Sequence, residues 1–465
     1  MTRLSNAAFW ALGACVLLAS TPVLTRSSQA PAVYFVIVDG DDAGAGTERS
    51  PWRTIQRCVG QLAPGDTCMI GAGTFAEAVV VSRSGSSGSP IRIIGQSGDR
   101  TTIAGSLLIS GDHVVVEDMR VDMPAGATWG LRLYGHAGVA SGMHVTSTSD
   151  SLGMNNLAAA VSGSGNTLTR SRLERTCFGL SLGGTSNVIS HNELTDMWTN
   201  GGRCGDVDYV RLFGTNHQLR NNVLHGVDRS RTGSAHVDCF QSFDNNGPDR
   251  AVQNIVIDGN FCSDVSQGVL FTAKVHQLSR DVIISNNVFS KVAAWCALLE
   301  DIDGVRIFNN TCDTSTAHHG MWCRSTTDKG SCEFKNNIFY GRGTAYGVMG
   351  RARLIDGQPG APGRNNLLFS TPGQSQGQFK QYGADRVNVD PEFVDRDGGD
   401  YRLLPSSPAR DAGVAIPGWP NPVDYDGVAR PQGGGWDIGA YEYTDTRPIA
   451  PGGLRIVPDA SPAAR

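Results

Sequence analysis

The chain has 465 residues, of which only 7% are aromatic, and its 58 glycines favour short strands and turns over long helices. Its 44 acidic residues outnumber its 39 basic ones, which argues against a nucleic-acid partner, because such proteins present a basic face to the phosphates. Beyond residue 30 no apolar stretch is long enough to span a bilayer, so we expect no stable membrane insertion.

Residues 1–30 have the pattern of a secretory signal peptide. Arg3 precedes an apolar run over Ala7–Ala19, and Ser28–Ala30 offers small residues for cleavage. Leu12–Cys15 is a weaker match to a lipoprotein signal. Removal of these residues leaves 39 − 2 = 37 basic and 44 acidic residues, a net charge of −7. We therefore expect a protein that is secreted, periplasmic or held at the cell surface.

The cysteines indicate an oxidising compartment. Ten of them lie beyond the signal segment, which is compatible with disulfides. The sequence does not determine their connectivity. The pairs that we expect are Cys58 with Cys68 and Cys177 with Cys204, and the 27 residues between the second pair match about one repeat of the chain.

Residues 31–82 are predicted to hold a strand and a helix ahead of the repeats. The strand is Tyr34–Val38. The helix is predicted to begin with Ser50 as its N-cap and Pro51 in its first turn, and to end at Pro64–Asp66. Its apolar face comprises Trp52, Ile55, Val59 and Leu62. A helix in this place would cap the open strand edges of a first coil.

Residues 83–385 contain a repeat whose marker is an asparagine followed by apolar residues. The markers are Asn192, Asn222, Asn260, Asn287, Asn310, Asn337 and Asn366, separated by 30, 38, 27, 23, 27 and 29 residues. Short β-branched runs such as Ile255–Ile257 precede them, without a leucine-rich consensus or paired helices. Stacked coils would place each asparagine above the next, where the amides hydrogen-bond and tolerate a left-handed bend. The pattern predicts an all-β parallel β-helix.

Segments at both ends of the repeat resemble a known family. They are Ser50–Gln56, Leu62–Thr67, Gly71–Phe75, Asp390–Phe393, Ser407–Gly413, Asp424–Gly427 and Asp437–Glu442. Together with the asparagines they resemble secreted bacterial proteins of the pectate-lyase-like superfamily, over about residues 33–443. The resemblance implies a right-handed parallel β-helix with an N-terminal capping helix and a closing segment at 386–443, and it is specific for fold rather than activity. Residues 444–465 are predicted to be a disordered tail.

Charged and polar residues recur at one level of the repeat. The strands concerned are Tyr209–Leu212, His236–Gln241, Val269–Lys274, Leu298–Asp301 and Met321–Arg324. Alternate residues of a strand face outward, and outward residues of successive coils lie side by side. Asp208 and Asp238 each lie 16 residues past their own marker asparagine. The two longest intervals, 30 and 38 residues, fall here, and insertions in repeat proteins gather at the binding face.

These residues predict cleavage of an acidic polysaccharide by β-elimination. Lys274, its pKa lowered by neighbouring cations, would abstract the proton alpha to a uronate carboxylate. His236 and Asp238 point the same way from their strand, so both would act on one ligand. The expected catalytic residues are Lys274, His236, Asp238 and Arg211, and the expected substrate-binding residues are Arg324, Gln241 and Asp208.

A calcium site is a further expectation. Glu300, Asp301 and Asp303 would hold Ca²⁺ with carbonyl oxygens, and the resemblance implies that the ion would neutralise a uronate. A solvated acidic turn is the alternative. His318–His319 is a weaker candidate for zinc, because no third ligand stands at metal spacing.

Other functions remain open. A glycoside hydrolase would use Asp238 and Glu300 as its carboxylate pair. A non-catalytic carbohydrate-binding solenoid would use outward aromatic rings, for which Trp295 and Trp322 are candidates. Lys274 is also compatible with a solvated strand end, and His236 and Asp238 with turn contacts. The polygalacturonase signatures Asn-Thr-Asp and Arg-Ile-Lys and the epimerase motif Asp-Pro-His are absent. We expect a monomer.

Overall fold

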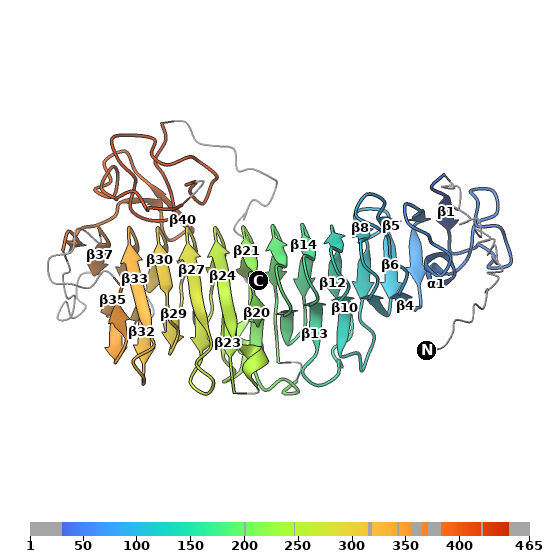
Figure 1. The fold of residues 1–465 in the computed structure, drawn as a ribbon, viewed down its shortest axis with the longest axis horizontal. Helices are drawn as coiled ribbons and strands as arrows, with labels where there is room; N and C mark the ends of the chain where they lie inside the picture. Colours follow the sequence, from blue (N-terminus) through green and yellow to red (C-terminus); the bar gives the residue numbers. More distant parts are fainter. Residues whose placement is uncertain are drawn as a thin grey trace, which may run out of the picture.

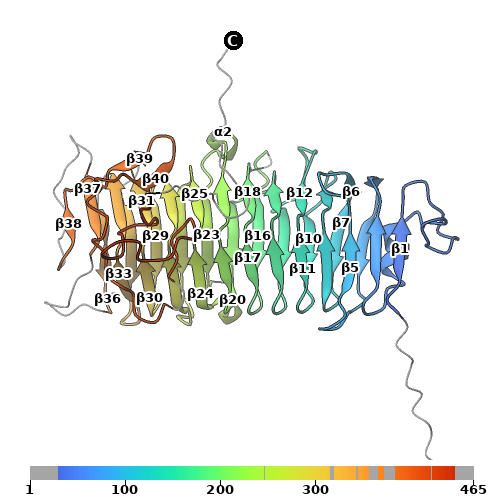
Figure 2. The ribbon, with the colours of Figure 1, turned by 90° about the horizontal axis from the view of Figure 1, so that it is seen from above.

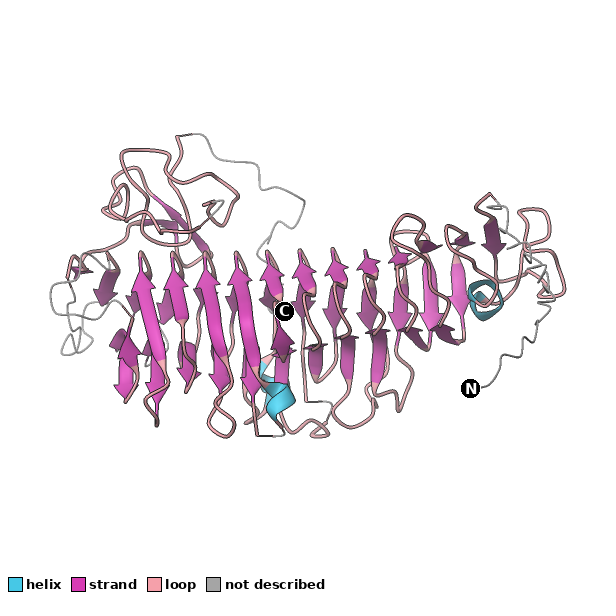
Figure 3. Cartoon of the chain, viewed as in Figure 1, coloured by secondary structure: helices cyan, strands magenta, loops and turns pink. Residues whose placement is uncertain are grey.

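The structure is a computed structural model that describes residues 30–199, 201–245, 247–314, 319–341, 344–355, 365–370, 383–419 and 422–445. Three parallel sheets run along the axis of one solenoid (Figures 1 and 2). Within each sheet, neighbouring strands come from successive coils and pair in parallel. The predicted all-β parallel β-helix is confirmed, and helices are short and few among the described residues (Figure 3).

The strands of the three sheets follow one another in each coil. Sheet 1 comprises β1 (Val33–Val36), β2 (Thr67–Ile70), β5 (Ile91–Ile94), β8 (Val114–Glu117), β11 (Val139–Ser141), β14 (Thr167–Thr169), β17 (Val188–Ser190), β20 (Gly214–Thr215), β21 (Gln218–Arg220), β24 (Val252–Asp258), β27 (Arg280–Ser285), β30 (Val305–Phe308), β33 (Ser331–Lys335) and β36 (Arg353–Leu354). Sheet 2 comprises β4 (Ala78–Val81), β7 (Ser106–Ile109), β10 (Trp129–Leu133), β13 (Leu157–Val161), β16 (Phe178–Leu182), β19 (Val207–Leu212), β23 (Val237–Phe243), β26 (Gln267–Thr272), β29 (Trp295–Glu300), β32 (His319–Ser325) and β35 (Thr344–Gly350). Sheet 3 comprises β3 (Gly73–Phe75), β6 (Thr101–Ala104), β9 (Arg120–Asp122), β12 (His144–Thr146), β15 (Arg172–Glu174), β18 (Glu193–Thr195), β22 (Val223–His225), β25 (Phe261–Ser263), β28 (Val288–Ser290), β31 (Thr311–Thr314), β34 (Ile338–Gly341), β37 (Leu367–Ser370) and β38 (Arg386–Val387).

Apolar side chains fill the interior of the solenoid in rows. One row consists of Leu180, Val210, Phe240, Val269, Ala297 and Met321, which occupy equivalent positions of successive sheet 2 strands. All are almost fully buried. Because each coil covers the apolar side of the next, the core runs the length of the molecule and fixes the register of every strand.

The asparagine ladder is confirmed. The side-chain oxygen of each marker accepts the backbone N–H of the previous marker, for example Asn192 N–H to Asn222 Oδ1 and Asn222 N–H to Asn260 Oδ1, each at 3.0 Å. The series continues to Asn366, which donates to Asp385 Oδ1 at 2.9 Å. A second, shorter ladder that the repeat did not reveal joins Asn166 and Asn187, at 2.8 Å.

The two asparagines of each pair have different tasks. The first residue takes the left-handed conformation, with φ of 53° at Asn221, 52° at Asn286 and 51° at Asn309. Asparagine tolerates this conformation better than most residues. The second residue then forms the ladder. The bend and the amide stack were predicted together, and the structure assigns them to neighbouring residues.

The N-terminal helix is shorter than predicted. Helix α1 covers Ile55–Val59 with Thr54 as its N-cap, so Ser50 is not the cap. The reason is tertiary: Trp52 N–H donates to the Phe35 carbonyl, which holds this stretch extended beside β1. The predicted apolar face is nevertheless buried, from Trp52 to Leu62. Helix α1 lies at the N-terminal end of the solenoid (Figure 1).

Both expected disulfides are present, and three more accompany them. Cys58–Cys68 and Cys177–Cys204 are confirmed. The others are Cys239–Cys262, Cys296–Cys312 and Cys323–Cys332, each joining two sheets within one coil. Residues 1–29 and 446–465, which hold the expected signal and most of the expected tail, lie outside the described residues. No helix in the described part of the chain is long and apolar enough to cross a membrane.

The segment after β38 folds back over the outer side of sheet 3 (Figures 1 and 2). It contains the antiparallel pair β39 (Phe393–Asp395) and β40 (Asp400–Leu403). One outward column of sheet 3 is charged at His144, Arg172 and Glu193, whereas from Val223 to Leu367 it is apolar except at Thr311. The apolar members, Val223, Phe261, Val288, Ile338 and Leu367, pack against Tyr401, Leu403, Ile438 and Tyr441. The column therefore becomes apolar where the C-terminal segment covers sheet 3.

Candidate functional site

Sheet 2 presents its outward side chains in columns along the solenoid axis. One column holds Phe178, Asp208, Asp238, Gln267 and Trp295 on successive strands. A second column, three residues further along the strands, holds Ser181, Arg211 and Gln241. The register confirms that Asp208 and Asp238 are equivalent positions of neighbouring coils.

Three aspartates, Asp206, Asp208 and Asp238, lie together at the start of β19 and β23. Asp208 and Asp238 are fully buried, whereas the side chain of Asp206 is 26% exposed. Arg211 Nε donates to Asp208 Oδ2 at 2.7 Å, and its terminal nitrogen lies 3.5 Å from Asp206 Oδ2. Gln241 Nε2 donates to Asp238 Oδ2 at 3.1 Å and to Asp206 Oδ2 at 3.3 Å. We call these three acids the aspartate cluster.

The cluster has unusual electrostatics. Burial raises the pKa of Asp208, and the charge of Asp206 raises it further against the opposing effect of Arg211. Burial and the charge of Asp208 raise the pKa of Asp238 well above its ordinary range. The second oxygen of each buried acid has no hydrogen-bond partner among the described residues. Protons are therefore retained here at a pH where most carboxyl groups have lost them.

Two clefts meet at Asp206. One has a volume of about 400 Å³ and the other about 490 Å³, and both are lined by Gly205 and Asp206. We call the first the aromatic cleft; its other lining residues are Asn155, Leu157, Phe178, Ser181, Arg211, Phe213, Phe243 and Arg250. We call the second the polar cleft; its other lining residues are Thr199, Gly202, Cys204, Thr232, Gly233, Ser234, Ala235 and His236.

Arginines in the aromatic cleft are held by aromatic rings. The Arg211 guanidinium carbon lies 3.7 Å from the Phe178 ring centre, and that of Arg250 lies 4.4 Å from the Phe213 ring centre. Phe213 packs edge-on against Phe243, with ring centres 5.2 Å apart. Planar cations fixed in this way are suited to binding a carboxylate through two hydrogen bonds.

The other predicted charges form a separate group. Lys274 Nζ lies 2.6 Å from Glu300 Oε2, and Arg324 pairs with Glu300 Oε1. Glu300 is two strands from Asp238 and five residues further along its strand than Trp295, the residue in register with Asp238. These offsets correspond to about 10 Å across and about 16 Å along the sheet. The structure therefore does not bring Lys274, Glu300 and Arg324 to the aspartate cluster.

The three acids expected to hold calcium point to different partners. Glu300 is bound by Lys274 and Arg324. Asp301 accepts hydrogen bonds from residues 325–327. Asp303 contacts Ser331. Across the described ranges, no group of three or more His, Cys, Asp or Glu side chains is placed to hold a metal ion.

The two candidate tryptophans lie on the same outward face. Trp295 stacks on His319 with ring centres 4.0 Å apart, and Trp322 meets Trp295 edge-on at 6.4 Å. They form one aromatic patch two and three strands beyond Asp238. His318 lies outside the described residues, so the weaker zinc candidate His318–His319, for which a turn is the favoured interpretation, is not tested.

Sequence reasoning assigned no role to several residues of the clefts. Asp206 precedes Asp208 by two residues in the sequence, but its place at the junction of two clefts depends on the turn before β19. Phe178 and Arg250 come from a neighbouring strand and from a 3₁₀ helix, Pro248–Arg250. The signal that would have found Phe178 is the strand register, since Phe178 is directly beside Asp208.

The fold is that of the pectate-lyase-like parallel β-helix. No family model matches the chain, and no curated protein matches its sequence. Among solved structures it is similar to the pectate lyase Pel9A, with 15% identity and a TM-score of 0.52, covering 90% of this chain and 97% of that one. It is also similar to the PL6 family polysaccharide lyase Pedsa3628 from Pseudopedobacter saltans, with 12% identity and a TM-score of 0.51, covering 75% and 94%.

Proposed function

We propose that the protein cleaves an acidic polysaccharide, and that the bond to be broken lies over Asp206. The observation that carries the proposal is the meeting of two clefts at this residue, directly beside buried acids that retain protons. A glycan chain that occupies both clefts would cross Asp206 between two sugar units. The fold, shared with a pectate lyase and a PL6 polysaccharide lyase, is compatible with this activity.

β-elimination is the reaction that the charges favour. Arg211 and Arg250 in the aromatic cleft would bind the uronate carboxylate and stabilise the negative charge that develops on it. Asp206 would accept the proton alpha to that carboxylate. The carbon–oxygen bond then breaks, a carbon–carbon double bond forms, and His236 in the polar cleft protonates the leaving oxygen.

This assignment changes the role expected for Lys274. Its Nζ is held by Glu300 at 2.6 Å and lies outside both clefts. To act as the base it would have to leave that ion pair and reach a substrate bound elsewhere. Asp206 and His236 meet the substrate directly in the proposed arrangement.

Glycoside hydrolysis is the second candidate, and the buried acids favour it. Asp238 retains its proton and contacts Gln241, which also contacts Asp206. Asp238 would therefore act as the general acid of a hydrolase, with Asp206 as the second carboxyl group of the pair. The earlier pair of Asp238 and Glu300 is too far apart, because carboxylates of such enzymes are about 5 to 9.5 Å from each other.

The experiment is an assay of the purified protein on pectate, alginate and glycosaminoglycans, with and without Ca²⁺. A rise in unsaturated-uronate absorbance supports elimination, and new reducing ends without that absorbance move the assignment to hydrolysis. Asp206→Asn is expected to lower the rate by about 10²- to 10⁴-fold. The matched control is Asp249→Asn, an exposed acid close to Arg250. If neither unsaturated uronate nor new reducing ends form, a carbohydrate-binding solenoid is the better hypothesis.

We also propose that the protein is exported and acts on its polysaccharide as a monomer. Five disulfides support an oxidising compartment, because the cytosol keeps thiols reduced. The test is expression of the full chain in a bacterial host, followed by fractionation and sequencing of the N-terminus. Recovery from the cytoplasm with Met1 retained would contradict export.

A further inference from the structure

The outward face of sheet 2 continues beyond the aromatic cleft onto strand β10. Leu157 lines the cleft and pairs in register with Trp129 on the neighbouring strand. In the adjoining column Arg211, Ser181, Ala160 and Arg132 occupy successive strands. Arg132 is thus three strands from Arg211, a distance of about 14 Å along the solenoid axis.

Arg132 is held between aromatic rings. Its guanidinium carbon lies 4.2 Å from the Trp129 ring centre and 5.7 Å from that of Tyr134. Its neighbours in register, Leu108 and Ala160, are apolar. The rings fix the plane of the guanidinium much as Phe178 fixes that of Arg211.

The charge of Arg132 has no compensation nearby. In the part of the chain that the structure describes, Arg132 forms no ion pair, and its buried Nε has no hydrogen-bond partner. Arg211, in contrast, is paired with Asp208 and Asp206. Leaving a buried donor of a charged group without an acceptor costs free energy, and an anionic ligand would remove that cost.

We propose that Arg132, with Trp129 and Tyr134, forms a distal subsite that binds the acidic group of a second sugar of the same polysaccharide. This inference rests on the proposed function and extends it. The subsite and Arg211 would recognise two carboxylates separated by about three strand spacings along one chain. The protein should therefore prefer acidic oligosaccharides long enough to reach both arginines.

The test measures affinity rather than turnover. In the Asp206→Asn background, binding of uronate disaccharides and hexasaccharides, from both pectate and alginate, is followed by calorimetry. Arg132→Gln is expected to weaken hexasaccharide binding about tenfold or more, because it removes a charge-assisted pair of hydrogen bonds. Disaccharide binding at the aromatic cleft should remain within about twofold, a change of less than 0.5 kcal/mol.

Two further variants make the outcome decisive. Arg280→Gln removes an exposed arginine of sheet 1 that pairs with Asp281 at 2.7 Å, and it should leave both affinities unchanged. Trp129→Leu keeps the charge but frees the guanidinium, and it should weaken only the hexasaccharide. Equal hexasaccharide affinity in Arg132→Gln and Arg280→Gln would overturn the subsite, as would equal loss for both lengths. If Arg132→Gln weakens binding of the hexasaccharide alone but the unmodified protein cleaves no substrate, the subsite stands and only the proposed cleavage is overturned.

Discussion

Asp238 shows how one buried side chain links the site to the pH dependence of stability. Its pKa is raised by burial and by the charge of Asp208, so the folded protein binds a proton that the unfolded chain releases near pH 4. Stability therefore falls as the pH rises above about 4, since the folded state then holds more protons than the unfolded state. At neutral pH, Asp238 therefore lowers the free energy of unfolding of the protein.

We predict that Asp238→Asn stabilises the protein at pH 8 and leaves it nearly unchanged at pH 4. Each unit of raised pKa corresponds to about 1.4 kcal/mol, and asparagine can still accept the hydrogen bond from Gln241. Urea unfolding of both proteins at the two pH values measures the difference. A stability difference that does not change with pH would contradict the raised pKa.

The contribution of His144 to stability depends on pH in another way, because its stabilising form is the protonated one. Although burial lowers its pKa, hydrogen bonds with Glu174 at 3.0 Å and Asp99 at 2.7 Å raise the pKa above the ordinary 6.5. Burial also opposes ionisation of Glu174, but hydrogen bonds from His144 and Arg172 lower its pKa to about 2. The contribution of His144 is thus complete below pH 6.5 and is lost as the pH rises through its folded pKa.

His144→Gln is accordingly expected to destabilise the protein by about 1 kcal/mol at pH 6 and by much less at pH 9. Glu174 contributes in the other direction, since its stabilisation is present above pH 4.5 and is lost as the pH falls towards 2. The measurement is chemical unfolding of the variant and the unmodified protein across this range. His136→Gln, at an exposed histidine, is the control for loss of a histidine side chain.

At the scale of elements, the ladder carries the strongest structural prediction. Asn260 Oδ1 accepts the backbone N–H and the side-chain amide of Asn222, and its own amide donates to the Leu219 carbonyl and to Asn287. Asn260→Ala leaves several buried groups without partners and should cost about 2 to 4 kcal/mol of unfolding free energy. Thermal or urea unfolding checks this. Asn245→Ala, in an exposed turn, should change stability by about 0.5 kcal/mol or less.

The ladder was predictable because it depends on one residue type at a repeating position. The helix start was not, since Trp52 is drawn into extended pairing with Phe35, a contact that local capping preferences do not reveal. The site was predicted in part. Aligning segments by their distance from the ladder placed Asp208 beside Asp238, but it ignored the position of Lys274 along its strand. Residues on neighbouring strands meet only when they also share a column.

For the whole molecule, the covered half of sheet 3 raises the question of what holds the C-terminal segment in place. The first asparagine of each pair supplies part of the answer. Asn286, Asn309, Asn336 and Asn365 each donate a side-chain hydrogen bond to a backbone carbonyl of residues 412–437. The asparagines that form the bend between strands therefore also bind the C-terminal segment to the solenoid.

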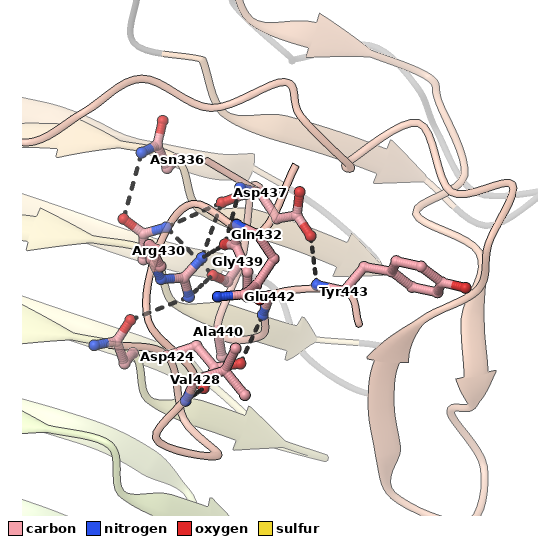
Figure 4. A network of polar contacts seen from close by, with 12 residues as sticks. Asn336, Asp424, Val428, Arg430, Gln432, Asp437, Gly439, Ala440, Glu442 and Tyr443 are labelled. Carbon is pink, nitrogen blue, oxygen red and sulfur yellow. Dashed lines mark hydrogen bonds and ion pairs between the residues drawn. The ribbon is translucent and has the colours of Figure 1, made fainter. Parts of the chain in front are cut away.

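A further attachment is a buried ion pair (Figure 4). Arg430 lies 2.8 Å from Glu442, and both side chains are 1% exposed. Arg430 also donates to Asn286 Oδ1 and to the Gly439 carbonyl. Glu442 accepts the backbone N–H groups of Gln432 and Asp437. The pair thus joins the loops of the segment to the solenoid.

Arg430→Met should lower the free energy of unfolding by about 3 to 5 kcal/mol, because it leaves Glu442 buried without its cation. The double variant Arg430→Met with Glu442→Gln should recover part of that stability, because it also removes the buried negative charge. Local detachment of the segment would expose the apolar column of sheet 3 that includes Phe261 and Leu367. Hydrogen exchange of residues 401–441 measures the detachment, and exchange in β10 and β13 serves as the internal reference. Uniform faster exchange throughout the solenoid would contradict a local role, because it would mean that the segment and the coils unfold as one unit.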